Sequence, residues 1–257
     1  MSGRKYVNLV VTGASGRVGR LICDLVGAHE EQWELVGAVA HPRSSRLGQP
    51  SFTSSDHAPI VTPNFGGKCD LVIDFSTPAG TETAIQIALR EGAALLVGTT
   101  GLPESTRQVL EAAARRIAVL LAPNTSVGVA TCAALVEQAA RLLGPGYRVE
   151  IVEAHHKHKK DAPSGTALML AEAAKKGGAS IEPDQIHALR GGDVVGEHTI
   201  RFAGEGEYLE ILHRATSRSL FARGSLRAGR WLVTQPPGFY TMSDVLRRAA
   251  ADASSRT

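Results

Sequence analysis

The chain has 257 residues, of which 43% are hydrophobic and 21% charged, and this fits one large globular domain or two modest ones. A net charge of +3, without a basic stripe carrying aromatic residues, argues against a nucleic-acid partner. No stretch predicts a membrane span, and the short apolar run near the N-terminus predicts a first strand rather than a signal peptide. The scattered cysteines Cys23, Cys69 and Cys132 favour reduced thiols in a cytoplasmic protein.

A glycine turn follows the first predicted strand, Val7–Thr12, and leads into a helix predicted over Val18–Gly27. A strand, a glycine turn and a helix in this order are typical of dinucleotide-binding proteins. Gly13 would permit the tight turn, Gly16 would let the backbone approach a pyrophosphate, and Gly19 would let the helix pack on the strand. NAD(P) and FAD fit this pattern, and so does a close turn without a ligand. The candidate residues of the turn are Gly13, Ala14, Ser15, Gly16, Arg17 and Val18.

The second predicted strand, Glu34–Ala40, lacks the acid that usually follows such a strand. A cofactor with a free ribose 2′-hydroxyl is normally bound there by Asp or Glu. The segment His41–Arg46 instead contains two arginines, two serines and no acid, which suits a 2′-phosphate. His41 and Arg43 therefore favour NADPH over NADH, which stays possible, and the alternative is that the arginines belong to an ordinary loop.

Further strands and helices alternate along the first half of the chain. This alternation predicts an α/β fold with a doubly wound parallel sheet, in which ligands bind at the carboxyl ends of the strands. The segment 48–68 predicts a loop with a minor strand near Ile60. The predicted strands are Asp70–Phe75, Ala94–Val97 and Ile117–Leu121, the predicted helices span 76–91 and 103–116, and the later strand ends are Gly98–Thr100 and Ala122–Ser126.

From Val127 the pattern changes to a smaller α+β domain with a mostly antiparallel sheet. The tail after Gln235 is expected to return to the first domain, so the predicted domains are residues 1–126 with 236–257 and residues 127–235. Residues 177–193 predict a polar connection. The other predicted elements are the helices Val127–Leu143, Thr166–Lys176, Ser217–Val233 and Met242–Ala251, and the strands Val149–Ala154, Glu197–Ala203 and Glu207–His213.

The segment Glu153–Ala167, EAHHKHKKDAPSGTA, joins six consecutive basic residues to a turn that opens a helix. Ser164 is a good N-cap, so backbone N–H groups near Gly165 and Thr166 are expected at a helix start. Such N–H groups and the positive helix end bind anions, and the neighbouring lysines favour a small ligand with more than one negative charge. The histidines and lysines also supply proton donors near neutral pH.

Two other interpretations of this basic run stay open. It could be a solvated loop, although the apolar strand before it and the helix cap after it argue against that. It could also bind a metal, since His156 and His158 share one strand face. However, the alternating lysines repel a cation, and no cysteine or further carboxylate stands at ligand spacing. We therefore expect no metal.

These motifs resemble those of the dihydrodipicolinate reductase (4-hydroxy-tetrahydrodipicolinate reductase) family, nicotinamide-dependent enzymes of the diaminopimelate route to lysine. EAHHKHKKDAPSGTA matches the family signature E-[LA]-H-H-x-x-K-x-D-A-P-S-G-T-A. GASGRVG, DFSTP, GTTG, APNTSVGV, GDVVGEHT and LEILHRATSR stand in the family's order, so the resemblance spans nearly the whole chain. It implies a Rossmann domain plus a substrate domain whose open mixed sheet builds a homotetramer.

The resemblance also implies a reaction and its residues. A cyclic imine formed from 4-hydroxy-tetrahydrodipicolinate would be reduced by NAD(P)H to tetrahydrodipicolinate, with His155 and Lys159 in proton donation. His156 and the start of the following helix would hold the dicarboxylate. The implied substrate-binding residues are His156, Ser164, Gly165, Thr166 and Thr100, and the cofactor residues beyond the second strand are Gly98, Thr99, Thr100, Ala122, Pro123, Asn124 and Thr125.

Two departures from the family pattern concern the cofactor. Many members carry an acid followed by Arg where this chain has His41-Pro42-Arg43, and the loss of the acid argues against NADH. Many members also have Phe at the position of Thr125, so one contact near the nicotinamide would differ.

Other functions fit the sequence less well. Short-chain dehydrogenases share the TGASGRVG opening, but they need Tyr-x-x-x-Lys, and none of the four tyrosines has Lys four residues on. A different imine or amino-acid dehydrogenase would leave the Pro-Ser-Gly-Thr turn beside two histidines unexplained. A non-catalytic NADP(H) sensor would have no use for a proton donor.

Overall fold

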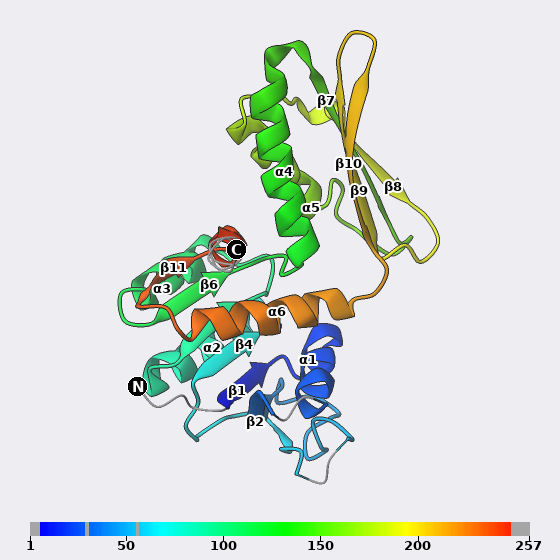
Figure 1. Ribbon diagram of the computed structural model, residues 1–257. Helices are drawn as coiled ribbons and strands as arrows, with labels where there is room; N and C mark the ends of the chain where they lie inside the picture. The colour runs from blue at the N-terminus through cyan, green and yellow to red at the C-terminus, as the bar shows by residue number, and fades with distance from the viewer. Residues whose placement is uncertain (1–5, 29–30, 55–56, 248–257) are drawn as a thin grey trace. The chain divides into compact units, whose positions relative to one another are not determined.

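The chain forms two compact units in the computed structural model, which describes residues 6–28, 31–54 and 57–247 (Figure 1). Unit 1 comprises Met1–Thr125 and Phe221–Thr257, and unit 2 comprises Ser126–Leu220. The chain leaves unit 1 one residue before the expected boundary at 126 and returns at Phe221 instead of at residue 236.

Helix α6 (Ser219–Leu232) causes the earlier return to unit 1. Its buried residues include Ala222, Ala228 and Leu232. A Cβ atom on Gly229 would lie 2.6 Å from Cδ2 of Leu71, so the helix backbone packs directly on a strand of unit 1. The helix was expected in the second domain because its amphipathic pattern does not tell which core it covers.

Unit 1 is built on a parallel sheet which, within the described residues, has seven strands in the order β11-β6-β5-β4-β1-β2-β3. The order reverses between β1 and β4, as it does in doubly wound folds, so the expected α/β fold is confirmed. The strands are β1 (Val7–Thr12), β2 (Trp33–Val39), β3 (Val61–Thr62), β4 (Leu71–Asp74), β5 (Ala94–Val97), β6 (Ala118–Leu121) and β11 (Gly238–Tyr240).

Local sequence explains where the helices of unit 1 begin and end. In α2, the Thr77 hydroxyl accepts the N–H of Gly80, Pro78 occupies the first helical position, and Gly92 ends the helix with φ of 65°. The helix α1 has no side-chain cap, because its N-cap is Gly16. The remaining helices of this unit besides α6 are α1 (Arg17–Gly27), α2 (Pro78–Glu91) and α3 (Glu104–Ala113).

Strand β11 is an element that the sequence did not predict. Its three residues follow Pro236 and Pro237, and such a short strand carries no measurable periodicity. It pairs in parallel with β6, with Gly238 opposite Ala118. The predicted last helix begins at Met242 and continues to residue 247, and its remaining residues lie outside the described part of the chain.

Unit 2 contains a mixed four-stranded sheet, in the order β10-β9-β7-β8, and the helices α4 and α5 lie on one side of it (Figure 1). Strands β7 and β8 are parallel, and the other neighbours are antiparallel. Alternate residues of β7, such as Val149 and Ile151, face the core against Leu170 and Val136. The elements are α4 (Val127–Leu143), β7 (Arg148–His155), α5 (Gly165–Lys176), β8 (Ile186–Arg190), β9 (Gly196–Ala203) and β10 (Tyr208–Ala215).

Strand β8 lies inside the segment that was predicted as a polar connection, so that prediction was wrong. Its sequence, IHALR, is mostly exposed and belongs to an edge strand, where burial imposes no clear alternation. Its pairing places Ile186 opposite Ile151 and Arg190 opposite His155. The consequence for the site is that Arg190 lies beside the end of β7.

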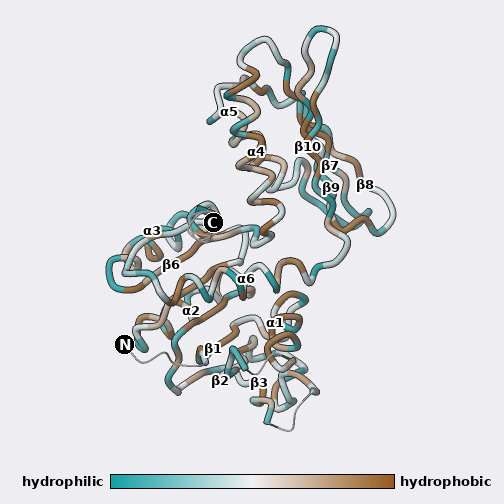
Figure 2. The backbone as a smooth tube through the Cα atoms, in the orientation of Figure 1, coloured by the Kyte–Doolittle hydropathy of each residue, from teal (hydrophilic) through white to brown (hydrophobic). Residues whose placement is uncertain are grey.

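Helix α4 and the turn after it, Val127–Gly146, are long and apolar enough by length and composition to cross a membrane, contrary to the expectation from the sequence. Figure 2 shows the hydrophobic stretches along this helix. Val129, Val136 and Ala140 of α4 are buried, and the last two belong to the core of unit 2. One side of α4 therefore packs on the core of unit 2, whereas 28% of the apolar stretch as a whole is buried.

Candidate active site

A cavity of about 420 Å³ opens in unit 1 where strands β1, β2 and β4 end. This position, beside the reversal of strand order, is where doubly wound sheets bind nucleotides. Residues from the glycine turn, from the end of β2 and from the start of α2 line it. They are Thr12, Gly13, Ser15, Gly16, Val39, Ala40, His41, Pro42, Pro63, Asn64, Phe75, Ser76, Thr77, Ala79, Gly80 and Thr83.

Gly13 and Gly19 have the structural roles that the sequence predicted for them. Gly13 has φ of 76°, and a Cβ there would lie 2.2 Å from the carbonyl oxygen of Phe75. A Cβ on Gly19 would lie 2.2 Å from the carbonyl oxygen of Gly13, so α1 could not approach the turn with any larger residue. A side chain at either position would therefore displace the turn that forms this wall of the cavity.

The structure places the predicted cofactor residues at one edge of the sheet but not all in this cavity. Gly13, Ser15, Gly16 and His41 line it. Ala14 is buried, and its N–H donates to the Val39 carbonyl. The other predicted cofactor residues do not line this cavity: Arg17, Val18 and Arg43, the segment Gly98–Thr100 after β5, and the segment Ala122–Thr125 after β6.

Thr125, one of these outer residues, and the nearby candidate Arg46 have structural partners of their own. Thr125 is fully buried, and its hydroxyl donates to the Phe221 carbonyl at 2.7 Å. This bond joins the two segments at which the chain leaves and re-enters unit 1. Arg46, which the sequence suggested for the phosphate, donates to the Pro50 carbonyl at 2.7 Å, whereas Arg43 is exposed.

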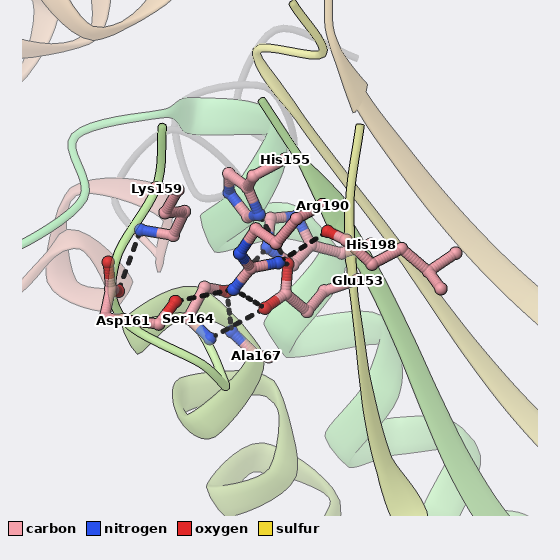
Figure 3. A network of polar contacts seen from close by, with 9 residues as sticks. Glu153, His155, Lys159, Asp161, Ser164, Ala167, Arg190 and His198 are labelled. Atoms are coloured by element: carbon pink, nitrogen blue, oxygen red, sulfur yellow. Dashed lines mark hydrogen bonds and ion pairs between the residues drawn. The ribbon is translucent and has the colours of Figure 1, made fainter. Parts of the chain in front are cut away.

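A second polar site lies in unit 2, where strand β7 ends (Figure 3). The carboxylate of Glu153 is fully buried, and its Oε2 lies 2.5 Å from Nδ1 of His155. Arg190 of β8 donates to both oxygens of Glu153, at 2.8 and 2.9 Å. The N–H of Ser164 donates to Oε1 at 3.0 Å, so one carboxylate joins β7, β8 and the turn before α5.

Ser164 connects this carboxylate to the start of helix α5. Its hydroxyl caps the helix by accepting the N–H of Ala167 at 3.2 Å, as predicted. The same oxygen lies 3.2 Å from Nε2 of His198, a buried residue of β9. The rings of His198 and His155 meet edge to face, with centroids 5.2 Å apart. A Cβ on Gly165 would meet only open space, so the start of the helix is uncovered there within unit 2.

Lys159 and His156 lie at the edge of this network. The ammonium of Lys159 pairs with Asp161 at 2.8 Å, and about a fifth of its side chain is exposed (Figure 3). His156 lies beyond the end of β7, with its ring 6.3 Å from that of His158. The structure thus brings His155, Ser164 and Arg190 together around Glu153, with Lys159 beside them on Asp161, whereas His156 belongs to the adjoining loop.

The pKa values follow from burial and from the surrounding charges. Burial acts to raise the pKa of Glu153, but the hydrogen bonds from Arg190 and His155 outweigh it, and the pKa is lowered. Burial lowers the pKa of His155; the charges on Lys159 and Arg190 add to this, and Glu153 opposes it. Burial lowers the pKa of His198 to about 4. At neutral pH the carboxylate is therefore charged, and both imidazoles are neutral.

This protonation state decides which ring nitrogen of His155 carries the proton. A carboxylate only accepts hydrogen bonds, so the proton of neutral His155 is on Nδ1, and Nε2 carries a lone pair. A Cβ on Gly196 would lie 3.0 Å from Nε2, so glycine at this position leaves that nitrogen accessible. Nε2 of His155 can therefore accept a hydrogen bond or a proton from a substrate.

Sequence reasoning missed four polar residues of these sites: Asp74, Glu153, Arg190 and His198. A signal existed for Glu153, since period-two alternation puts it on the buried face with Ile151 and His155, and a buried carboxylate needs a cation. Arg190 carried no such signal, because its strand was not predicted.

Comparison with known proteins agrees with this geometry. The family model described as the N-terminus of dihydrodipicolinate reductase matches residues 7–125, and the model of its C-terminus matches residues 128–246. A 4-hydroxy-tetrahydrodipicolinate reductase of Anaeromyxobacter dehalogenans is 44% identical over 93% of this chain and 97% of its own length. Another, of Stenotrophomonas maltophilia, is 45% identical over 94% and 98%.

Solved structures show the same fold. A dihydrodipicolinate reductase from Paenisporosarcina sp. TG-14, with dipicolinate bound, superposes with a TM-score of 0.69 at 21% identity, over 92% of this chain and 97% of that one. An amine dehydrogenase from Mycobacterium smegmatis superposes with a TM-score of 0.54 at 12% identity, over 92% and 95%. The two family models together cover nearly the whole chain, and the relatives match it at 44–45% identity. The chain therefore belongs to the dihydrodipicolinate reductase family of oxidoreductases.

Proposed function

We propose that this chain reduces the cyclic imine derived from 4-hydroxy-tetrahydrodipicolinate to tetrahydrodipicolinate, with NADPH as the preferred hydride donor. The observation that carries the proposal is the cluster of His155 and the Ser164-capped helix start around one buried carboxylate, with Lys159 held beside it by Asp161. Relatives more than 40% identical carry this activity in their names. The cofactor, when bound, supplies the hydride, and the residues of the chain supply binding, orientation and a proton.

The substrate bears two carboxylates, and unit 2 offers cationic and N–H groups for them. The start of α5 at Gly165 and Thr166 presents the positive end of a helix, held in place by the Ser164 cap. Lys159 lies in the same segment, and His156 adjoins it. One carboxylate at the helix start would fix the ring in a single orientation before reduction.

Reduction adds a hydride to ring carbon 4 and leaves a nitrogen-conjugated anion that takes up one proton. Besides Arg190, which is bound to Glu153, Lys159 is a cation of this segment, and it can supply this proton directly. His155 is neutral at pH 7, so it must first gain a proton at Nε2 before it can donate one. We therefore assign Lys159 as the donor and His155 as the neutral partner that binds the substrate and relays the proton.

The end of β2 supports the preference for NADPH. The cavity is lined there by Val39, Ala40, His41 and Pro42, without a carboxylate that would bind a ribose 2′-hydroxyl or repel a 2′-phosphate. Arg43 follows directly and is exposed, and its guanidinium suits a phosphate.

The sheet of unit 2 supports a homotetramer. Helices α4 and α5 cover one face, and the described residues of unit 2 place no helix on the other. Val152, Leu189 and Leu212 alternate with the core-facing residues, and each is at least 38% exposed. The charges on this open face pair with each other, as Arg201 does with Glu210, which leaves the apolar side chains for a second copy of the chain.

The function and the cofactor preference are tested together by following nucleotide oxidation at saturating substrate, generated from pyruvate and aspartate semialdehyde by the preceding synthase. We expect rapid oxidation of NADPH and a clearly lower kcat/KM with NADH. Arg43→Ala should lower kcat/KM for NADPH about tenfold and leave NADH unaffected, because one charge-assisted contact is lost. Arg107→Ala, which removes an exposed arginine on α3, is the control. Equal use of both nucleotides would contradict the phosphate pocket, and no oxidation of either would contradict the function.

The proton donor is tested by substitution and by pH. Lys159→Ala should lower kcat about 10²–10⁴-fold, whereas Lys157→Ala should leave it within about twofold. Because the pKa of His155 is lowered, its imidazolium fraction grows only as pH falls below the ordinary value of 6.5. A rate that depended on that imidazolium would rise as pH falls from 8 to 6. With Lys159 as the donor, kcat does not rise over this range, and an increase would reassign the role to His155.

The tetramer is tested by sedimentation velocity. Leu212→Asp places a charge on the open face, on the edge strand β10, and should convert the tetramer into smaller species at micromolar concentration. Leu142→Asp is the matched control, because Leu142 is 75% exposed on α4, away from this face. A wild-type monomer, or a Leu212→Asp tetramer as stable as wild type, would refute the assignment of this face.

A further inference from the structure

The carboxylate of Asp74 is fully buried where strand β4 ends, and it accepts hydrogen bonds from four hydroxyl groups. Thr12 and Ser76 donate to Oδ1 at 2.6 and 2.5 Å. Thr81 and Thr99 donate to Oδ2, both at 2.7 Å. Two donors on each oxygen fill the acceptor positions that a carboxylate offers.

The four hydroxyls come from the segments that surround the cavity of unit 1. Thr12 ends β1 directly before the glycine turn, and Ser76 belongs to the turn after β4; both line the cavity. Thr99 follows β5, and its oxygen also accepts the N–H of Ser76 at 2.9 Å. Thr81 lies in the first turns of α2 and does not line the cavity. One side chain thus joins three strand ends and a helix at the point where strand order reverses.

Hydrogen bonding to a carboxylate fixes which way each hydroxyl points. A hydroxyl group has one hydrogen and two lone pairs, and a carboxylate takes the hydrogen. Ser76 illustrates the choice, because its oxygen lies 2.5 Å from Asp74 but 3.2 Å from the nearest alternative acceptor, the Thr77 carbonyl. The oxygens of Thr12 and Ser76 therefore face a ligand only as acceptors. They suit donors such as ribose hydroxyls or a carboxamide NH₂, and they do not suit phosphate oxygens.

We propose that Asp74 is a positioning residue of the nucleotide site: it turns this wall of the cavity into a set of hydrogen-bond acceptors. The proposal rests on the assignment of this cavity to the cofactor. The two walls then divide the ligand between them, with the glycine turn and the start of α1 receiving phosphates and the Asp74 wall receiving hydroxyl or amide groups. Asp74 itself contacts no ligand and acts through Thr12 and Ser76.

Asp74→Asn tests this role because asparagine keeps the shape but replaces one acceptor oxygen with a donor NH₂. Both hydroxyls that donate to that oxygen must then turn to accept instead. We expect the Kd for NADPH, measured by its fluorescence, and the KM for NADPH to rise about tenfold or more. The KM for the dicarboxylate substrate should stay within about twofold, because the residues proposed to bind its carboxylates belong to unit 2. A general loss of stability would not raise the KM for NADPH while leaving the KM for the dicarboxylate substrate unchanged.

Asp70→Asn is the matched control. Asp70 lies at the opposite end of the same strand, where its carboxylate accepts the N–H of Asn8 at 2.9 Å. Its substitution should leave the Kd for NADPH unchanged, whatever it does to the thermal unfolding midpoint. Ser76→Ala provides a milder test should Asp74→Asn fold poorly, and we expect a rise of at least about threefold in the Kd.

The outcomes are separable. Folded Asp74→Asn or Ser76→Ala protein with the wild-type Kd would overturn the positioning role while leaving the cofactor site intact. An equal rise in Asp70→Asn would show that the effect is general destabilisation, and it would also overturn the role. Wild-type protein that binds no nucleotide would instead refute the assignment of the cavity, which is part of the proposed function.

Discussion

The buried charge of Glu153 is the constraint on which the polar site of unit 2 depends. A carboxylate with no exposure to water is stable only if cations and hydrogen-bond donors replace its hydration. Arg190 supplies two bonds, His155 and the backbone of Ser164 supply the others, and Arg190 also donates to the Asp161 carbonyl at 2.5 Å. Removing one partner from such a pair typically costs about 3–5 kcal/mol. The bonds that stabilise the charge thereby fix the imidazole and the start of α5.

Each unit thus places a buried carboxylate where a strand ends, but the two use different partners. Glu153 is neutralised by a guanidinium, and the remaining positive field, together with burial, keeps His155 neutral. Asp74 is surrounded by hydroxyl donors, which leave it without a paired cation among the bonds that it accepts. In the function that we propose, the first arrangement prepares a ring nitrogen for proton transfer, and the second orients the wall of the nucleotide cavity.

The sequence predicted those parts that depend on local patterns. Alternation of strands and helices, the glycine turn at Gly13, and the Ser164 cap were all visible, because propensity, periodicity and turn chemistry act over a few residues. Arg190 and Asp74 were not found as site residues, because their partners come from strands distant in sequence. The edge strand β8 has no buried periodicity. The amphipathic helix α6 could not be assigned to a unit, since its pattern does not identify the core that it covers.

The most direct test of this account is an NMR titration of the His155 imidazole nitrogens in the free enzyme. We predict a neutral ring at pH 7 with the proton on Nδ1, and a titration midpoint below 6.5, because burial and the charges of Lys159 and Arg190 outweigh Glu153. A midpoint above 6.5, with both nitrogens protonated at pH 7, would show that Glu153 holds an imidazolium. In that case Arg190 would not neutralise the carboxylate, and the proton for reduction would come from His155.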